Sequence, residues 1–260
     1  MESEILNNQE LRRYNRHIIL PEIGVNGQEK IKSSSVLVVG AGGLGAPVLQ
    51  YLNAAGTGKI GVIDMDLVSE NNLQRQVLYG DNDIGKLKSI ISRDRLISQN
   101  SLTDIQIINI KLTKENILSI IPEYDFIIDA TDNFETRFLI NDACILTDKP
   151  WVFGSIYKFE GQVSVFNFNN GPSLRCIFPH QPKKDAAPDP KKLGVLGVLP
   201  GFIGMMQANE AIKLMTGYGD ILSGKMLIYN ILNNHSKIIR FSKNEKKFNI
   251  SEIGHYEEIE

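Results

Sequence analysis

The sequence has very few cysteines and no long apolar run. Two cysteines in 260 residues, Cys144 and Cys176, cannot form the framework of a small disulfide-stabilised secreted protein. No uninterrupted apolar stretch approaches the roughly 18 residues that a membrane helix needs. The first ten residues are polar and acidic, without the apolar core of a secretory signal. These absences predict a cytoplasmic protein that makes no contact with a membrane.

The chain also lacks a marked excess of charge of either sign. Its 28 basic and 30 acidic residues give a formal net charge of −2. Such a balance provides no broad positive field to attract a nucleic-acid backbone, so we expect no nucleic-acid partner. The apolar share of 42% and the mean hydropathy of −0.12 are typical of a globular protein.

The most informative stretch runs from Ser35 to Asp66. Glycines in a turn between a strand and a helix let the backbone approach a phosphate, and the helix N-terminus offers free N–H groups. Asp64 follows Gly45 by 64 − 45 = 19 residues, about the distance at which an acid accepts ribose hydroxyls. The stretch predicts a nucleotide site, and the alternative is a tight turn whose glycines serve only packing. Its parts are a strand over 36–39, the turn glycines Gly40, Gly42, Gly43 and Gly45, a helix to about Ala55, and a strand over 60–63.

A polar, amide-rich segment over 65–76 follows this second strand. Asn72, Arg75 and Gln76 provide donors and acceptors close in sequence to the glycine turn. We then expect a helix over 81–98 that carries Lys86 and Lys88 in its first turns. A lysine near a helix start opposes the helix dipole, so Lys88 is either solvated or placed to meet an anion.

The strand and helix alternation continues to about residue 150. We expect a strand over 105–110, a short helix over 114–121, a buried strand over 126–130 and a helix from about Phe134. Asp132 follows the buried strand directly, where open α/β sheets place their ligand-binding residues. Asp132 is therefore a candidate for a metal or nucleotide role, or else the N-cap of the next helix.

From Trp151 the pattern changes to antiparallel strands, expected over 151–155, 159–168, 225–230 and 236–241, with a buried helix over about 200–216.

We predict one α/β domain over 1–260 whose mostly parallel, Rossmann-like sheet has helices on both faces. It comprises a helical lead-in over 1–35, a nucleotide-binding half over 36–150 and an antiparallel half over 151–260. A loop over 179–193, rich in proline, lysine and aspartate, is expected to be mobile.

Linked motifs across residues 10–241 resemble those of the MoeB/ThiF/HesA family, bacterial relatives of the ubiquitin-activating enzymes. The resemblance implies an adenylyltransferase that uses ATP and Mg²⁺. Its substrate would be the C-terminal glycine carboxylate of a ubiquitin-like sulfur-carrier protein ending in Gly-Gly, and pyrophosphate would leave as the acyl-adenylate forms. The motifs are Arg13-Tyr14-Asn15-Arg16, the glycine turn, Asp64-Met65-Asp66, Asn72-Leu73-Gln74-Arg75-Gln76, Lys88, Thr131-Asp132-Asn133 and Gly194-Val195-Leu196-Gly197.

The resemblance also implies a role for each matching residue. Asp64 would hold the ribose hydroxyls, and Asp132 would bind Mg²⁺. Arg16 would reach across the interface of a homodimer to the γ-phosphate side of the partner's ATP. The residues that would surround the triphosphate are Asn72, Arg75, Gln76 and Lys88.

The sequence departs from the family pattern at two places. Relatives commonly carry two Cys-x-x-Cys pairs that bind a structural zinc, but here the first pair is reduced to Ser173 and Cys176 and residues 248–260 contain no cysteine. One thiolate with the distant His180 and His255 does not make a closed four-ligand site, so we predict that zinc is absent. Pro190 occupies the place of a loop cysteine found in many relatives, so sulfur would arrive from a separate donor protein.

Several functions remain open at this stage. The molybdopterin-synthase (MoeB) type and the thiazole-pathway (ThiF) type share every motif quoted above, so the motifs do not separate them. We take the MoeB type first, with the ThiF type and then a peptide-modifying adenylase as alternatives. An NAD-dependent oxidoreductase could share the opening fold, but the polar stretch over 70–76 and the lack of a catalytic acid/base pair argue against it. A non-catalytic partner subunit is disfavoured because Arg16, Arg75, Lys88 and Asp132 are all present.

Overall fold

The described strands form a single eight-stranded sheet. The computed structural model describes residues 5–182, 194–245, 250–254 and 256. The strand order is β3-β2-β1-β4-β5-β6-β7-β8, with parallel pairing from β3 to β5 and antiparallel pairing from β5 to β8. The mixed α/β fold class is therefore confirmed. The strands are β1 (Ser35–Val39), β2 (Lys59–Ile63), β3 (Asp104–Ile108), β4 (Phe126–Asp129), β5 (Trp151–Tyr157), β6 (Glu160–Phe166), β7 (Lys225–Asn230) and β8 (His235–Arg240).

The change from parallel to antiparallel pairing occurs at β5, which begins at Trp151. Trp151 of β5 pairs in parallel with Ile127 of β4 and antiparallel with Phe166 of β6. The predicted change to antiparallel strands at Trp151 therefore falls on the strand at which the pairing changes, and only the parallel pairing of β5 with β4 was not foreseen. A buried apolar run carries no information about the direction of its neighbours, so the sequence alone could not predict that β5 pairs in parallel with β4.

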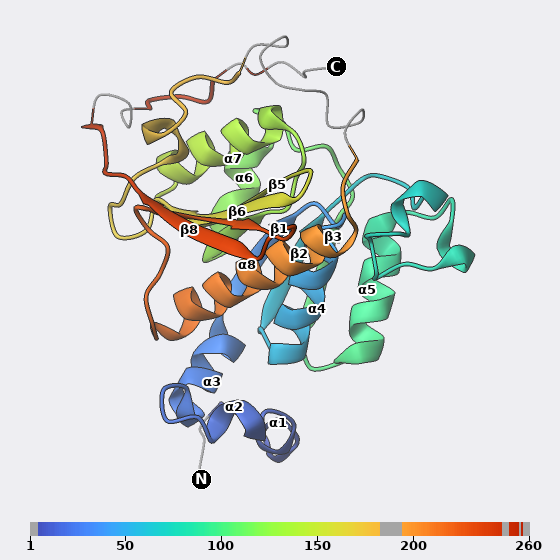
Figure 1. Cartoon of the computed structure of the whole chain (residues 1–260). Coiled ribbons are helices and arrows are strands. Elements are labelled where there is room, and N and C mark those ends of the chain that lie inside the picture. The colour runs from blue at the N-terminus through green and yellow to red at the C-terminus, as the bar shows by residue number, and fades with distance from the viewer. Residues whose placement is uncertain (1–4, 183–193, 246–249, 255, 257–260) are drawn as a thin grey trace.

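Helices cover both faces of the sheet (Figure 1). Helices α4, α5 and α8 contribute to the apolar core on one face, and α6 and α7 to the core on the other. The N-terminal helices α1 to α3 gather beyond one end of the sheet, at the bottom of Figure 1. The helices are α1 (Asn8–Arg13), α2 (Asn15–Ile18), α3 (Gly24–Ser33), α4 (Gly45–Ala55), α5 (Lys88–Gln99), α6 (Ile117–Ile120), α7 (Phe134–Leu146) and α8 (Val198–Thr216).

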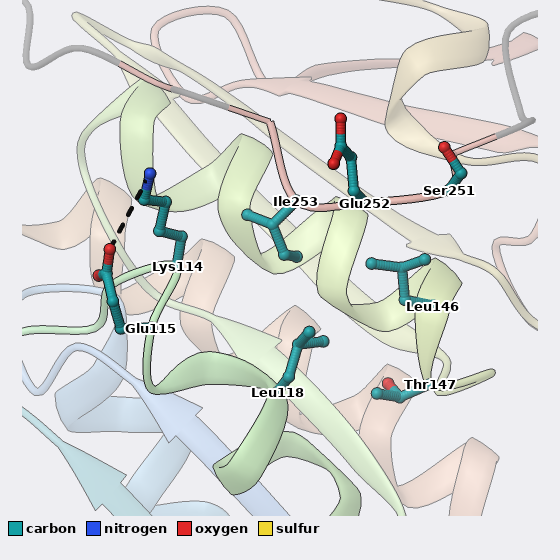
Figure 2. A pocket seen from close by; sticks show the side chains of 8 residues that line it. All are labelled: Lys114, Glu115, Leu118, Leu146, Thr147, Ser251, Glu252 and Ile253. Atoms are coloured by element: carbon teal, nitrogen blue, oxygen red, sulfur yellow. Dashed lines mark ion pairs between the residues drawn. The ribbon is translucent and has the colours of Figure 1, made fainter.

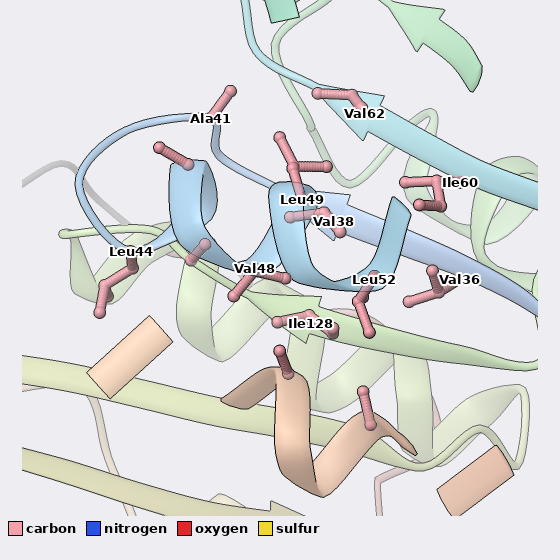
Figure 3. Close-up of a cluster of buried hydrophobic side chains, with 14 of the residues drawn as sticks. Val36, Val38, Ala41, Leu44, Val48, Leu49, Leu52, Ile60, Val62 and Ile128 are labelled. Carbon is pink, nitrogen blue, oxygen red and sulfur yellow. The ribbon is translucent and has the colours of Figure 1, made fainter. Parts of the chain in front are cut away.

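The alternation of side chains in β1 separates these two cores. Val36 and Val38 lie in the core that contains α4 and α8, while Leu37 and Val39 lie in the core that contains α7. Successive side chains of a strand point to opposite faces, so a strand buried on both sides reads as a continuous apolar run. Figure 3 shows Val38 beside Leu49 of α4 in the first of these cores.

Most element ends lie within a few residues of their predicted positions, but α5 does not. Residues 81–83 form a separate turn (η2, Asp81–Asp83), and α5 begins only at Lys88. The predicted helix over 81–98 is thus wrong in its first seven residues. Gly85 interrupts it with a φ of +81°, a conformation that glycine adopts without strain. Within the described ranges, no helix combines the length and apolarity needed to cross a membrane.

Candidate nucleotide-binding site

The sheet reverses its strand order beside β1, which lies between β2 and β4. Connections from neighbouring strands leave in opposite directions at such a point, and open α/β sheets bind ligands in the resulting crevice. A cavity of about 620 Å³ lies there. Its walls come from the glycine turn after β1, the segment 130–134 after β4, and residues of β5 and β6 such as Ser155 and Gln162.

The glycine turn is tight and open to the cavity at the same time. Gly40 has a φ of +96°, and a side chain there would place its Cβ 2.7 Å from the carbonyl oxygen of Ala130. A Cβ on Gly45 would overlap the carbonyl oxygen of Gly40, so the first turn of α4 packs directly on the strand end. Gly40, Gly42 and Gly43 line the cavity, whereas Gly45 lies behind it. The glycines therefore serve packing and also leave the backbone accessible.

Asp64 lines the cavity at the tip of β2 and holds the glycine turn. One carboxylate oxygen accepts the N–H of Ala41 at 2.8 Å, and the other accepts the N–H of Asp66 at 2.8 Å. Burial raises the pKa of Asp64 above its usual value, although the Lys88 ammonium and the two backbone donors act in the opposite direction. The predicted contact with ribose hydroxyls remains a prediction.

Lys88 is the first residue of α5 and is only 5% exposed. Its Nζ lies 2.8 Å from Oδ2 of Asp66, whose side chain is 66% exposed. The alternative that Lys88 is simply solvated is therefore wrong. The Asp66 carboxylate compensates this buried cation at a helix N-terminus, and Lys88 also lines the cavity, where the anion of a ligand could reach it.

Arg75 and Gln76 line the cavity beside the glycine turn. The guanidinium of Arg75 donates to the carbonyl oxygen of Asn71 at 3.0 Å. Gln76 is 4% exposed, and its Oε1 has no hydrogen-bond partner within the part of the chain that is described. An unsatisfied buried acceptor at a cavity wall is consistent with a site that a polar ligand completes. Asn72 does not line the cavity, and its amide donates to Oδ1 of Asn71 at 2.7 Å.

Asp132 lines the cavity from the opposite side and is exposed. Among the described residues, none makes a hydrogen bond or an ion pair with its carboxylate. Asn133, rather than Asp132, caps α7, because Oδ1 of Asn133 accepts the N–H of Thr136 at 2.8 Å. The N-cap alternative for Asp132 is thus wrong. One carboxylate suits Mg²⁺, which keeps several waters and also binds substrate phosphates; the described ranges contain no group of three or more candidate metal ligands.

A buried ion pair at the cavity was missed by the sequence analysis. Nε of Arg137 on α7 lies 2.9 Å from Oδ2 of Asp129, which is fully buried at the end of β4. The guanidinium also donates to the carbonyl oxygens of Thr131 at 3.1 Å and Gly154 at 2.9 Å. Arg137 therefore joins the ends of β4 and β5 beside the cavity. Its signal in the sequence is an arginine next to Phe138 in an apolar helix.

The structure does not bring Arg16 to this cavity within one chain. Arg16 is exposed on α2, and no described residue before Val39 lines the cavity. Helix α2 lies with α1 and α3 at the lower end of the molecule in Figure 1. Asn72 and Gly45 are the other predicted site residues that do not line the cavity.

A second hollow of about 620 Å³ contains none of the predicted site residues (Figure 2). It lies between Leu118 of α6, Leu146 at the end of α7 and the segment 251–253. Lys114 and Glu115, whose charged groups are 4.0 Å apart, line one side. The candidate site is therefore the cavity at the glycine turn.

The residues considered for zinc are partly engaged elsewhere. Sγ of Cys176 lies 3.7 Å from Oγ of Ser173 and accepts the N–H of Asn244 at 3.3 Å. The neighbouring Arg175 pairs with Asp142 at 2.8 Å, and the Tyr256 hydroxyl contacts both side chains. We call these three residues, Arg175, Asp142 and Tyr256, the tail clasp. His255, Pro190 and most of the predicted mobile loop lie outside the described residues.

Comparisons with known proteins give one consistent family. The ThiF family matches residues 14–250. A sulfur carrier protein adenylyltransferase of Thermus thermophilus is 46% identical over 243 residues, which cover 92% of this chain and 90% of that protein. A probable adenylyltransferase/sulfurtransferase MoeZ of Mycobacterium tuberculosis is 43% identical over 259 residues, which cover 98% of this chain and 66% of MoeZ.

Solved structures match the fold at lower sequence identity. The crystal structure of SeMet PaaA has a TM-score of 0.80 and 22% identity, over 94% of this chain and 77% of that one. The crystal structure of E. coli MccB with MccA-N7isoASN also has a TM-score of 0.80, with 21% identity over 92% of this chain and 74% of that one. At such identities the likeness concerns the fold alone.

Proposed function

The chain belongs to the ThiF family, and we propose that it is an ATP-dependent adenylyltransferase of the MoeB type. Its substrate is the C-terminal glycine carboxylate of a ubiquitin-like sulfur-carrier protein. The observation that carries the proposal is one cavity at the glycine turn lined by Arg75, Lys88 and Asp132 together. The Thermus relative named for a sulfur carrier, and a Porphyra purpurea relative named as a probable molybdopterin-synthase adenylyltransferase, support this substrate class.

The proposed reaction moves an adenylyl group to a carboxylate. A carboxylate oxygen attacks the α-phosphorus of ATP, the bond from that phosphorus to the bridging oxygen breaks, and pyrophosphate leaves with the electron pair. Arg75 and Lys88 neutralise negative charge on the triphosphate, and the backbone N–H groups at the start of α4 add donors. Phosphoryl-type transfer depends mainly on such positioning and charge neutralisation, so no protein nucleophile is required.

Asp132 is the residue that we propose binds Mg²⁺. Three other carboxylates at or beside the cavity are already engaged. Asp129 pairs with Arg137, Asp64 accepts two backbone N–H groups, and Asp66 pairs with Lys88. When bound, Mg²⁺ would screen the negative charge of the phosphates.

We propose that the protein functions without zinc and receives sulfur from a separate protein. Cys176 has hydroxyl and backbone neighbours rather than further thiolates, and the tail clasp joins the segment around it to α7. Metal analysis of the purified protein is expected to find far less than one zinc per chain. A stoichiometric zinc content would refute this proposal without affecting adenylation.

A homodimer is proposed because the cavity of one chain lacks Arg16. In this arrangement Arg16 of one copy enters the cavity of the other, on the γ-phosphate side of ATP. The exposed guanidinium on α2 and the absence of any lining residue from the described part of the lead-in support the arrangement. We expect no nucleic-acid or membrane partner, in line with the balanced charge.

The experiment that tests the proposed function is ATP–pyrophosphate exchange with Mg²⁺. It is run without a carrier and then with candidate carrier proteins ending in Gly-Gly, each paired with a control whose last glycine is deleted. Exchange that appears with one intact carrier establishes adenylation and distinguishes the molybdopterin type from the thiazole type. ATP binding without exchange would point to a peptide or another carboxylate as the substrate, and no ATP binding would overturn the proposal.

A further inference from the structure

Ala41, in the glycine turn, is held at both of its backbone polar groups. Its N–H donates to Oδ2 of Asp64 at 2.8 Å, and its carbonyl oxygen accepts from the hydroxyl of Tyr79 at 2.7 Å. Ala41 is fully buried, so neither group can use water instead. The conformation of the turn therefore depends on these two side chains.

The hydroxyl of Tyr79 also contacts helix α5. It lies 2.9 Å from Oγ of Ser92, which is fully buried. A phenol has one proton, so when Tyr79 donates to Ala41, the Ser92 hydroxyl is the donor to Tyr79. Burial raises the pKa of Tyr79 well above its usual value, which keeps this hydroxyl protonated.

Further contacts close a circuit between the glycine turn and α5. The N–H of Asp66 donates to Asp64, the Asp66 carboxylate pairs with Nζ of Lys88, and the Asp66 carbonyl oxygen accepts the Lys88 N–H at 2.9 Å. Lys88 and Ser92 are four residues apart on α5, about one helical turn. We call the whole set the Ala41 circuit, and its members are Ala41, Asp64, Asp66, Lys88, Ser92 and Tyr79.

We infer that Tyr79 is a positioning residue that sets the place of the Lys88 ammonium relative to the glycine turn. Tyr79 does not line the cavity, so it acts through Ala41 and Ser92 rather than by contact with a nucleotide. The inference rests on the proposed function, because the turn and Lys88 serve the same triphosphate. Groups that bind one ligand from two sides lose much of their effect when their separation changes by about 1 Å.

The first test is Tyr79→Phe, which removes the hydroxyl and keeps the aromatic ring. The Kd for MgATP, measured by calorimetry, is expected to rise about tenfold, because one net hydrogen bond is worth about that factor. The Kd for adenosine, which has no phosphates, is expected to stay within about twofold of wild type.

A matched control separates this effect from the loss of any buried hydroxyl. Tyr124 is 1% exposed, and its hydroxyl has no hydrogen-bond partner among the described residues. Tyr124→Phe therefore makes the same chemical change without breaking a hydrogen bond, and its Kd for MgATP is expected to equal that of wild type. An equal loss in both variants would overturn the inference.

A double-mutant cycle tests the coupling to Lys88. In a Lys88→Ala background, Tyr79→Phe is expected to change the Kd for MgATP by less than about twofold, because the ammonium that it positions is gone. A general weakening of the fold would instead give the same factor in both backgrounds and would overturn the inference. If Tyr79→Phe does not fold, Ser92→Ala replaces it in the same cycle, with a smaller loss in the same direction.

Binding of MgATP by the wild-type protein distinguishes a failure of the proposed function from a failure of the inference about Tyr79. If wild type binds no MgATP, the proposed function fails and the inference falls with it. If wild type binds MgATP and Tyr79→Phe binds it equally well, only the inference is overturned.

Discussion

At the scale of single residues, the charged side chains at the cavity are of two kinds. Some pair with a described residue of opposite charge, and others do not. Arg137 and Arg75 both line it, but Arg137 donates to Asp129 and to two carbonyl oxygens, whereas among the described residues Arg75 donates to one carbonyl oxygen. Asp129 and Asp132 differ in the same way. Residue type alone therefore does not identify which member of each pair is available to a ligand.

Replacing Arg75 or Asp132 should impair catalysis without unfolding the protein, because neither side chain forms an ion pair with a described residue. We expect Arg75→Ala or Asp132→Ala to lower the rate of ATP–pyrophosphate exchange by about 10²-fold or more, because each removes a charge that meets the phosphates. Arg93→Ala and Asp94→Ala are matched controls, since Asp94 is exposed and Arg93 partly exposed on α5, and neither lines the cavity. A near-normal rate would remove the affected residue from the site.

The sequence predicted the parts of the site that depend on local chain geometry. The glycine turn and Asp64 were found because their spacing reflects one strand–turn–helix–strand unit. The pairing of Asp129 with Arg137 was missed, because it depends on how α7 packs against two strands. Asn72 was placed at the site by resemblance, and the cavity does not include it.

At the scale of elements, α8 packs against the glycine turn from a distant part of the chain. A side chain on Gly43 would meet Pro200 of α8 at 3.1 Å, and a side chain on Gly204 would overlap the carbonyl oxygen of Leu44. The apolar sequence of α8 predicted the helix and its burial. It could not predict this contact, because nothing in a local pattern specifies a partner about 150 residues away.

The tail clasp provides a prediction about stability. Tyr256→Phe should lower the free energy of unfolding by about 1–2 kcal/mol, because it removes a hydroxyl bonded to two charged groups. Asp142→Ala should lower it further, by about 3 kcal/mol, because it leaves the largely buried Arg175 without its partner. Urea unfolding measures both, and a Tyr256→Phe loss no larger than that of Tyr124→Phe would contradict the prediction.

At the scale of the whole molecule, the proposed homodimer makes each site depend on two chains. Arg16→Ala and Arg75→Ala should each be inactive alone, since every site then lacks one arginine. When the two variants are unfolded and refolded together, half of the dimers should be mixed. Each mixed dimer contains one site with both arginines, so about a quarter of wild-type exchange activity is expected. If the mixture remains as inactive as its components, Arg16 does not act across an interface.

The position of α8 in the chain has a consequence for synthesis on the ribosome. Strands β1 to β4 and the glycine turn are complete by residue 129, but the helix that packs behind the turn spans residues 198–216. A nascent chain therefore exposes the back of its glycine turn while about 70 further residues are translated, since domains fold as units during synthesis. We expect stalled chains that end before α8 to be protease-sensitive at the turn, and those that extend beyond Thr216 to be protected.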